Sequence, residues 1–308
     1  MRVKSDWVIL LLSQMLEIYK TLWGVTEPLL ELIPRLRSEL GYTGVEACLL
    51  YVTPEDRATL LGASQRGEIK LVIMLQTSGD GVSDHLSSLD QQLADAVQFR
   101  PSKINIHGGQ DSWSYEESFE YFEGFLKLQA KYQSPELLGD AVPLLHETHR
   151  GRILYSPWVS LPILKAFPSL LLTADLSHWV VVSERHLSCF PEVMRLVAER
   201  TRHIHTRPCG TNSIQLGGLS LRSPEYGPDL SAFAGYWKSI FETQAKLGDL
   251  ASRVSIDPEF GPFPYAQLTP NGTLAQQHEL DADIEVVVQM VREIFIAAQS
   301  EAVGRSER

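Results

Sequence analysis

Acidic and imidazole side chains recur at regular intervals in the second half of the sequence. Glu147, Asp175, His205 and Glu259 each come at or just after the end of a short apolar run. Asp175 follows Glu147 by 28 residues, and His205 follows Asp175 by 30. Each step is about one strand and helix of an α/β barrel, roughly 31 residues. The step to Glu259 is longer because it contains a long segment, 210–228, rich in Gly, Ser and Pro. This spacing predicts four side chains at one level of successive strands.

Together these four residues have the chemistry of a metal site. Carboxylates gathered at the end of an apolar barrel repel one another, and their burial is costly unless a cation neutralises them. One imidazole with three carboxylates is an oxygen-rich ligand set that suits Mn²⁺, Mg²⁺ or Co²⁺, with Zn²⁺ also possible. A single carboxylate at a strand end is commonly a helix N-cap or an ion-pair partner. The four residues in series favour one divalent ion held by Glu147, Asp175, His205 and Glu259.

The elements that must position these residues are alternating strands and helices. Short apolar runs lie near 18–25, 44–52, 69–75, 103–107, 142–147, 169–175, 203–206 and 253–257. Between and after them are helical patterns such as 27–40, 84–98, 116–132, 190–200, 230–247 and 281–299. Alternation of this kind predicts parallel strands joined by crossover helices. Eight units in a chain of this length predict a single (β/α)8 TIM barrel. An open doubly wound sheet is less favoured, because no GxGxxG follows the first strand.

Composition narrows the function further. The chain has 308 residues, a hydrophobic content of 44% and a formal net charge of −11. That charge disfavours nonspecific binding to nucleic acid. Three cysteines without a CxxC pair fit a reducing compartment, and we expect a cytoplasmic protein. The apolar run within residues 1–14 is too short to span a membrane, so we expect no membrane association and interpret 1–14 as an extension ahead of a barrel formed by 15–308.

The strand-end motifs resemble the xylose isomerase-like TIM-barrel superfamily of sugar isomerases and epimerases. The segments 19–25 (YKTLWGV) and 41–46 (GYTGVE) are similar to its first two strands. The ketose 3-epimerase type within it binds a divalent ion through Glu, Asp, His and Glu on strands five to eight. The resemblance thus implies the same four ligands, and it covers nearly the whole chain after residue 15.

The resemblance also implies residues that contact substrate. Its Asp-x-x-His motif matches Asp175 and His178, which places His178 against the substrate. Arg207 is the nearest match to an arginine that follows the strand-seven histidine, although it lies closer to that histidine than in the ketose epimerases. His107, at the end of the fourth strand, is a further candidate for the pocket, and Gln215 and Trp179 are weaker candidates.

The expected activity is metal-dependent isomerisation or epimerisation of a sugar or small hydroxyketone through a cis-enediolate. Glu147 and Glu259 are the expected acid–base pair. The same enediolate would also serve a lyase or dehydratase. Two other readings stay open, a metal-dependent nuclease of the AP endonuclease type and a non-catalytic sugar-binding barrel. Barrels of this kind often pair, so a homodimer is one expected state.

The sequence also predicts where two further histidines, His203 and His146, lie in the barrel. His203 shares a face with His205 in a strand of period two, and we expect it to pack lower in the barrel. His146 alternates with Glu147 and should point towards the helices. His149 and His186 lie in predicted loops and receive no role.

Overall fold

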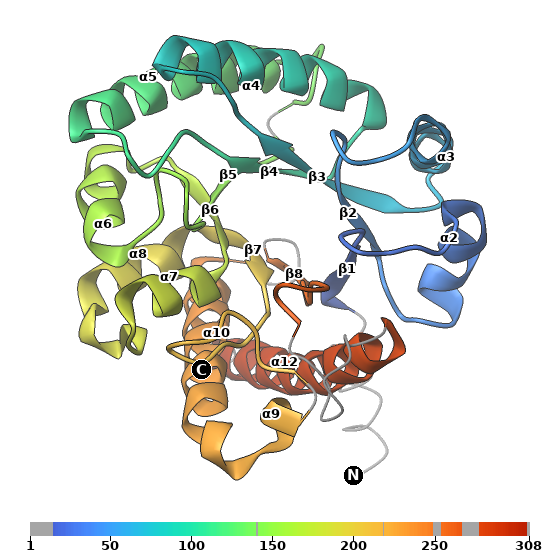
Figure 1. The fold of residues 1–308 in the computed structure, drawn as a ribbon, viewed down its shortest axis with the longest axis vertical. Helices are drawn as coiled ribbons and strands as arrows, with labels where there is room; N and C mark the ends of the chain where they lie inside the picture. Colours follow the sequence, from blue (N-terminus) through green and yellow to red (C-terminus); the bar gives the residue numbers. More distant parts are fainter. Residues whose placement is uncertain (1–14, 140, 218, 249–253, 267–276, 307–308) are drawn as a thin grey trace. The chain divides into compact units, whose positions relative to one another are not determined.

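The eight predicted strands form one closed barrel. The computed structural model describes residues 15–139, 141–217, 219–248, 254–266 and 277–306. Its strands follow one another around the barrel in the order β1 to β8 (Figure 1). Each pair of neighbouring strands whose residue register is defined runs parallel. The predicted single (β/α)8 barrel is therefore confirmed. The predicted extension, 1–14, lies outside the described residues.

The strands are short, and most of their side chains are buried. They are β1 (Glu17–Thr21), β2 (Gly44–Cys48), β3 (Lys70–Gln76), β4 (Lys103–His107), β5 (Leu144–Glu147), β6 (Leu171–Ala174), β7 (Thr201–His205) and β8 (Ser255–Asp257). Apolar runs such as that of β3 are buried because parallel barrel strands are covered on both faces. Every strand overlaps its predicted run, and β4 has the predicted bounds.

The helices lie outside the strands in Figure 1. They are α2 (Leu29–Ser38), α3 (Pro54–Gln65), α4 (Val82–Ala96), α5 (Tyr115–Tyr132), α6 (Pro157–Ala166), α7 (Leu176–Ser183), α8 (Pro191–Arg200), α9 (Leu219–Arg222), α10 (Gly227–Leu247) and α12 (Gln277–Ser306). Short 3-10 turns are η1 (Val97–Phe99), η2 (Leu187–Cys189) and η3 (Pro224–Tyr226). The segment 210–228, predicted as a loop, is partly helical because it contains α9 and η3 and the start of α10.

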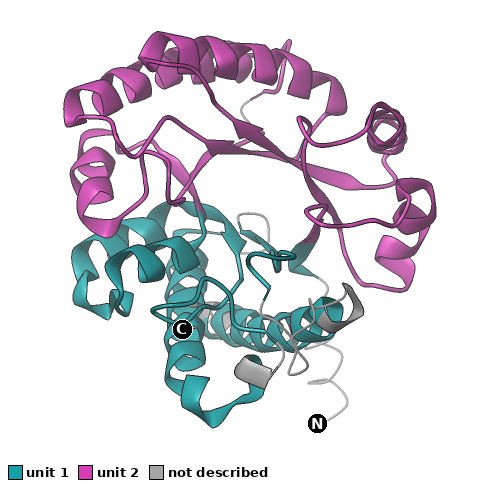
Figure 2. Ribbon diagram, viewed as in Figure 1, with its two compact units in different colours: residues 1–18, 174–308 teal, residues 19–173 magenta. Residues whose placement is uncertain are grey.

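The chain divides into two compact units, residues 19–173 and residues 1–18 with 174–308 (Figure 2). In the 19–173 unit, Tyr121, Phe122 and Phe125 of α5 are fully buried. In the other unit, α10 packs on α12, where the rings of Phe241 and Phe295 lie 5.5 Å apart. Each unit thus has aromatic side chains that fix helices in place.

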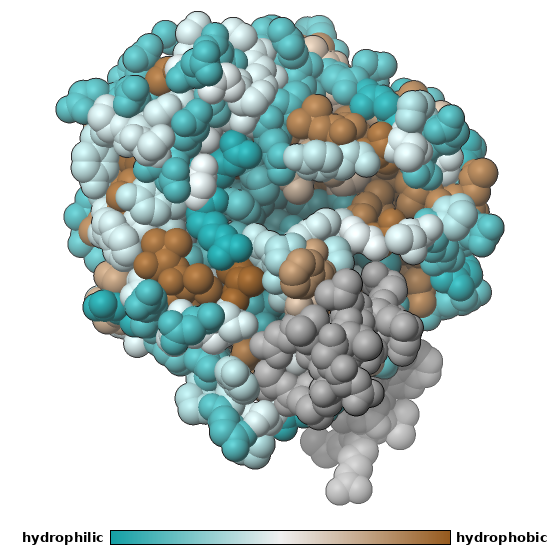
Figure 3. Space-filling view, in the orientation of Figure 1, coloured by the Kyte–Doolittle hydropathy of each residue, from teal (hydrophilic) through white to brown (hydrophobic). Residues whose placement is uncertain are grey.

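Hydrophilic side chains cover much of the face drawn in Figure 3, where apolar residues form separate patches. Within the described ranges, no helix has the length and apolar character needed to cross a membrane.

Candidate metal centre

Three of the four predicted ligands meet in the unit that contains residues 174–308. Asp175 follows β6, His205 is the last residue of β7, and Glu259 comes two residues after β8. Their donor atoms all lie within 4.8 Å of one another. The His205 Nδ1 atom is 3.7 Å from Asp175 Oδ2 and 3.3 Å from Glu259 Oε2. The three side chains converge because the carboxyl ends of parallel strands meet at one edge.

Asp175 uses its two oxygens differently. Its Oδ1 atom accepts hydrogen bonds from the Ser177 backbone N–H at 3.1 Å and from the Ser177 hydroxyl at 2.5 Å, which caps α7. Its Oδ2 atom faces His178 Nε2 at 3.5 Å, as well as His205. The helix-capping role and the candidate ligand role are therefore compatible in one carboxylate.

A guanidinium lies against the same carboxylates. Arg207 is buried, and its Nη2 donates to Asp175 Oδ2 at 2.5 Å. Its Nη1 donates to Glu259 Oε2 and to the Glu259 carbonyl, both at 3.0 Å. Burial alone would raise the pKa of the Asp175 carboxyl, but Arg207, with His178 and His205, holds that pKa well below its usual range. Asp175 is thus a carboxylate at neutral pH.

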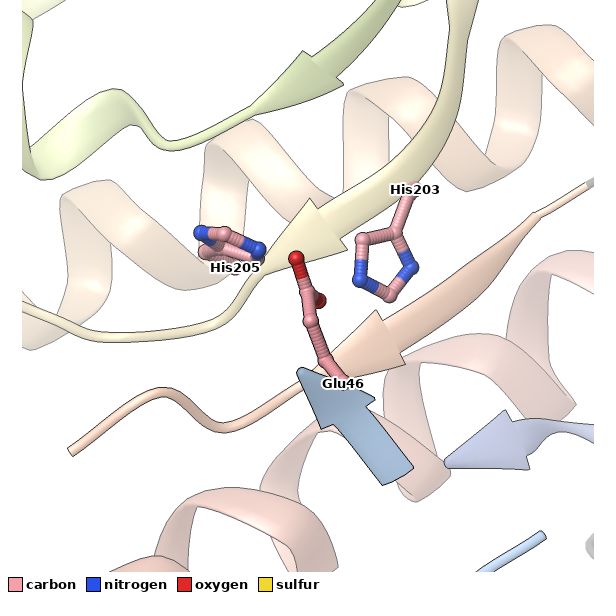
Figure 4. A group of neighbouring side chains, drawn as sticks. All are labelled: Glu46, His203 and His205. Atoms are coloured by element: carbon pink, nitrogen blue, oxygen red, sulfur yellow. The ribbon is translucent and has the colours of Figure 1, made fainter. Parts of the chain in front are cut away.

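His203 lies two residues before His205 on β7, and both rings project from that strand (Figure 4). Their centroids are 5.4 Å apart. The His203 Nδ1 atom lies 2.7 Å from the Ser255 hydroxyl, and Ser255 is its register partner on β8. The expected deeper position of His203 is confirmed.

Glu147 belongs to a second cluster, in the 19–173 unit. Its Oε2 atom accepts hydrogen bonds from the Asn105 amide at 2.6 Å and contacts His107 Nε2 at 2.8 Å. The same Asn105 amide donates to Glu46 Oε1 at 2.9 Å. Glu46 projects from β2 (Figure 4) and is buried, as are Asn105 and Glu147. One amide therefore bridges two buried carboxylates.

The other face of β5 is apolar. His146 has its ring within 5.7 Å of Tyr121, 5.0 Å of Phe122 and 4.4 Å of Phe125, measured between centroids. Burial lowers the pKa of His146 to about 3, so this imidazole is neutral at physiological pH. Its predicted orientation towards the helices is confirmed.

Several residues of the second cluster received no role from the sequence. His149 lies with its ring centroid 4.4 Å from that of His107, and these two with Glu147 have donor atoms within 4.8 Å of one another. Glu46 and Asn105 carried a usable signal, since each is a single polar residue inside a buried strand (GVEAC and KINIH). His149 carried none, because its loop conformation brings it back to β4.

The weaker candidates have structural contacts. The Gln215 side chain donates to the Gly261 carbonyl at 3.2 Å and accepts from the Gly261 N–H at 2.9 Å, which joins two loops. Trp179 is fully buried on α7. His186 pairs with Asp229 at 2.8 Å.

The structure therefore brings together Asp175, His205 and Glu259, with His178 and Arg207 beside them, in one unit. It brings together Glu147 and His107 in the other unit. Two carboxylate oxygens facing one imidazole nitrogen at these distances fit a divalent ion. The same oxygens contact Arg207, so a guanidinium and a metal ion would compete for them.

Comparison with known proteins places this arrangement in a known fold. No family model matches the sequence, and no curated protein matches it. Among solved structures, D-psicose 3-epimerase with D-fructose superposes with a TM-score of 0.58 at 12% identity, covering 91% of this chain and 99% of that one. The chain therefore shares the (β/α)8 barrel fold of this structure.

Two further solved structures share this barrel fold. Endonuclease IV from Thermus thermophilus has a TM-score of 0.52 at 16% identity, over 90% of this chain and 99% of that one. The IOLI protein, solved with a bound zinc atom, has a TM-score of 0.55 at 14% identity, over 92% and 98%. At these identities the likeness establishes the barrel fold alone, so function must be argued from the residues.

Proposed function

We propose that the protein is a divalent-metal-dependent isomerase or epimerase that acts on a sugar or a small hydroxyketone. The observation that carries the proposal is the close approach of Asp175, His205 and Glu259 at the ends of β6, β7 and β8. Glu147, at the end of β5, is proposed as the fourth ligand from its place in the series of strand ends. D-psicose 3-epimerase shares the fold, which supports this chemistry.

The proposed ion is Mn²⁺, Mg²⁺ or Co²⁺, with Zn²⁺ as the other candidate, because the donors are mainly carboxylate oxygens. Such an ion would supply Lewis-acid polarisation of a substrate carbonyl and its neighbouring hydroxyl.

Glu147 and Glu259 are the proposed acid–base pair. Removal of a proton from the carbon beside a carbonyl gives a cis-enediolate, and return of a proton at a carbon completes isomerisation or epimerisation. The Asn105 amide and the His107 ring fix Glu147 Oε2 in one orientation. Arg207 and His205 fix Glu259 Oε2 in the same way. Positioning of each carboxylate by two neighbours favours proton transfer at a defined atom.

His178 and Arg207 are proposed to hold substrate oxygens, and His107 is proposed to line the pocket. His178 and Arg207 both lie beside Asp175, His178 at 3.5 Å and Arg207 at 2.5 Å. Arg207 presents a planar cation with several donors, which suits substrate oxygens that gain negative charge.

Solvent deuterium exchange tests the acid–base pair. Metal-loaded protein incubated in D₂O with D-fructose or D-psicose should incorporate deuterium at the carbon beside the carbonyl. Glu147→Gln and Glu259→Gln should each slow exchange by about 10²–10⁴-fold, the usual contribution of a positioned acid or base. Mass spectrometry of the recovered sugar measures the exchange.

Matched controls are the exposed Glu68 and the half-buried Glu199, which pair with Arg66 and Arg195. Glu68→Gln and Glu199→Gln should leave exchange unchanged. Unimpaired exchange in both Glu147→Gln and Glu259→Gln would remove the proposed acid–base pair. A lyase or dehydratase would instead give a product that has lost water or a carbon fragment.

A nuclease is the second candidate, because endonuclease IV shares the fold. The net charge of −11 opposes binding to a phosphate backbone. Nicking of abasic DNA together with three zinc ions per chain would favour the nuclease. Ligand binding without proton exchange would favour a sugar-binding barrel.

The homodimer and the cytoplasmic location stay predictions from the sequence.

A further inference from the structure

Arg152 is a cation that the proposed acid–base chemistry does not use. It lies five residues after β5, in the 19–173 unit, and its side chain is partly buried. Its Nη1 donates to the Thr77 carbonyl at 2.9 Å and to the Gly109 carbonyl at 3.3 Å. Thr77 follows β3 and Gly109 follows β4, so the guanidinium lies at the carboxyl ends of these strands. That is the edge of the strands where His107 and Glu147 also lie.

The surrounding backbone fixes this guanidinium firmly. Gly109 has a φ of 62°, and a Cβ atom there would come within 2.4 Å of Ile153 and 2.6 Å of Trp113. The Gly109 N–H donates to the Thr77 hydroxyl at 2.9 Å, and the Ile153 N–H donates to the Gly108 carbonyl at 3.1 Å. Glycine at 109 thus permits the tight turn whose carbonyl accepts from Arg152.

The contacts of Arg152 leave one edge of the guanidinium for a ligand. Both of its hydrogen bonds to the described residues come from Nη1, and both acceptors are neutral backbone carbonyls. The edge formed by Nε–H and Nη2–H has no acceptor within the described ranges, and no described carboxylate forms an ion pair with Arg152. Two parallel N–H groups of this kind match the two oxygens of a carboxylate or a phosphate.

The electrostatic environment of Arg152 also favours an anionic ligand. Burial lowers the pKa of the Arg152 guanidinium, which means that its charge is incompletely compensated where it lies. Glu147 acts on it through space and does not contact it as an ion-pair partner. An anionic ligand group would provide the missing compensation.

We infer that Arg152 binds an anionic oxygen group, carboxylate or phosphate, on the substrate of this site. The inference rests on the proposed function for the location of the substrate and extends it to substrate class: a sugar acid, hydroxy acid or sugar phosphate rather than a neutral sugar. Arg152 is a specificity-determining residue, because it contacts a part of the substrate that does not react.

Paired ligands test the inference through binding. The full chain, loaded with Mn²⁺, is titrated calorimetrically with D-fructose, 2-keto-D-gluconate and D-fructose 6-phosphate. At least one of the two anions should bind about 10- to 100-fold more tightly than D-fructose, the range expected for charged hydrogen bonds. The anion that does so distinguishes carboxylate from phosphate.

Variants identify the residue responsible. Arg152→Gln should reduce the preference for the anion to less than about threefold and leave the Kd of D-fructose unchanged; Arg152→Lys should keep part of the preference. Arg66→Gln makes the same change in net charge on the surface of the same unit and should keep all of it.

Two outcomes overturn the inference. One is wild-type protein that binds neither anion more tightly than D-fructose. The other is an Arg152→Gln variant that weakens all ligands equally, which indicates that Arg152 only holds the loop. Deuterium exchange separates this test from the proposed function: exchange of neutral ketoses without charge selectivity overturns the inference alone, and charge-selective binding without exchange overturns the proposed function alone.

Discussion

Residues 174–308 and residues 19–173 each hold buried carboxylates, and they stabilise them with different groups. In the first region, the Arg207 guanidinium contacts both Asp175 and Glu259. In the second, the neutral amide of Asn105 lies between Glu46 and Glu147. A guanidinium supplies a full positive charge, whereas an amide supplies two hydrogen bonds and no net charge.

The two regions should therefore differ in how much they depend on cations from solution. Where the Arg207 guanidinium already contacts the carboxylates, we expect the region to be stable without metal, and a metal ion must compete with Arg207. Where a neutral amide bridges two carboxylates, the amide supplies no charge of its own, and we expect a cation from solution to lower the repulsion between them. Buried Asn105 Oδ1 also has no hydrogen-bond partner within the described ranges, so the second cluster is incompletely satisfied in the protein alone.

Removal of Arg207 gives the largest expected effect. Arg207→Met leaves Asp175 buried without its guanidinium, and loss of one partner of a buried ion pair costs about 3–5 kcal/mol. The free energy of unfolding in EDTA, measured with urea, should fall by this amount. Mn²⁺ should stabilise Arg207→Met more than the wild type, because the cation that competes for the carboxylate oxygens is gone.

Arg207→Lys is the control for this prediction, since it keeps the charge but not the planar pair of donors. It should lose less stability in EDTA than Arg207→Met and gain less from Mn²⁺. Equal unfolding free energies of wild type and Arg207→Met in EDTA would show that the guanidinium is not what stabilises these carboxylates.

Removal of Asn105 from the second cluster should lower the free energy of unfolding less than removal of Arg207 does. Asn105→Ala removes the amide shared by Glu46 and Glu147, and loss of the donor to a buried acceptor costs about 1–3 kcal/mol. Urea unfolding measures the loss in free energy of unfolding, with exposed Asn212→Ala as the control. A loss as large as that of Arg207→Met would contradict the distinction between amide and guanidinium.

The sequence predicted the barrel well because its strands carry strong local signals. Runs such as that of β3 are apolar throughout, and strand-end residues such as Asp175 and His205 follow at the interval of one βα unit. Helices α3, α6 and α7 were not among the helices predicted from the sequence. In α3 only Leu60 and Ala63 are buried, so it has no clear apolar stripe, whereas α7 is buried on nearly all sides. Periodicity cannot identify either kind of helix.

The site was predicted in part. Spacing was sufficient to group Asp175, His205 and Glu259, because each residue is fixed by its own strand. It could not show that Arg207 would contact two of them, since that contact depends on side-chain direction two residues past β7. Nor could it find Arg152, whose position depends on the turn at Gly109 and on a loop that returns to β3.

The two faces of β5 give the last and smallest prediction. Glu147 faces polar partners, and adjacent His146 is buried against α5 with its pKa lowered to about 3. In the unfolded chain a histidine has a pKa of about 6.5. The neutral imidazole therefore contributes stability that is fully present above about pH 6.5 and is lost as the pH falls towards 3, by at most about 1.4 kcal/mol per pH unit. Tyr121, the titratable neighbour on α5, has its pKa raised by burial and stays neutral in this range.

His146→Gln should therefore reduce the slope of unfolding free energy against pH between about 6.5 and 4 by about that amount. Urea unfolding at several pH values measures the slope, because each transition gives the free energy at one pH. A variant with the wild-type slope would show that His146 does not titrate on unfolding. Any acid sensitivity of the protein would then have to come from other titratable groups, because only a group whose pKa differs between the folded and the unfolded chain makes stability depend on pH.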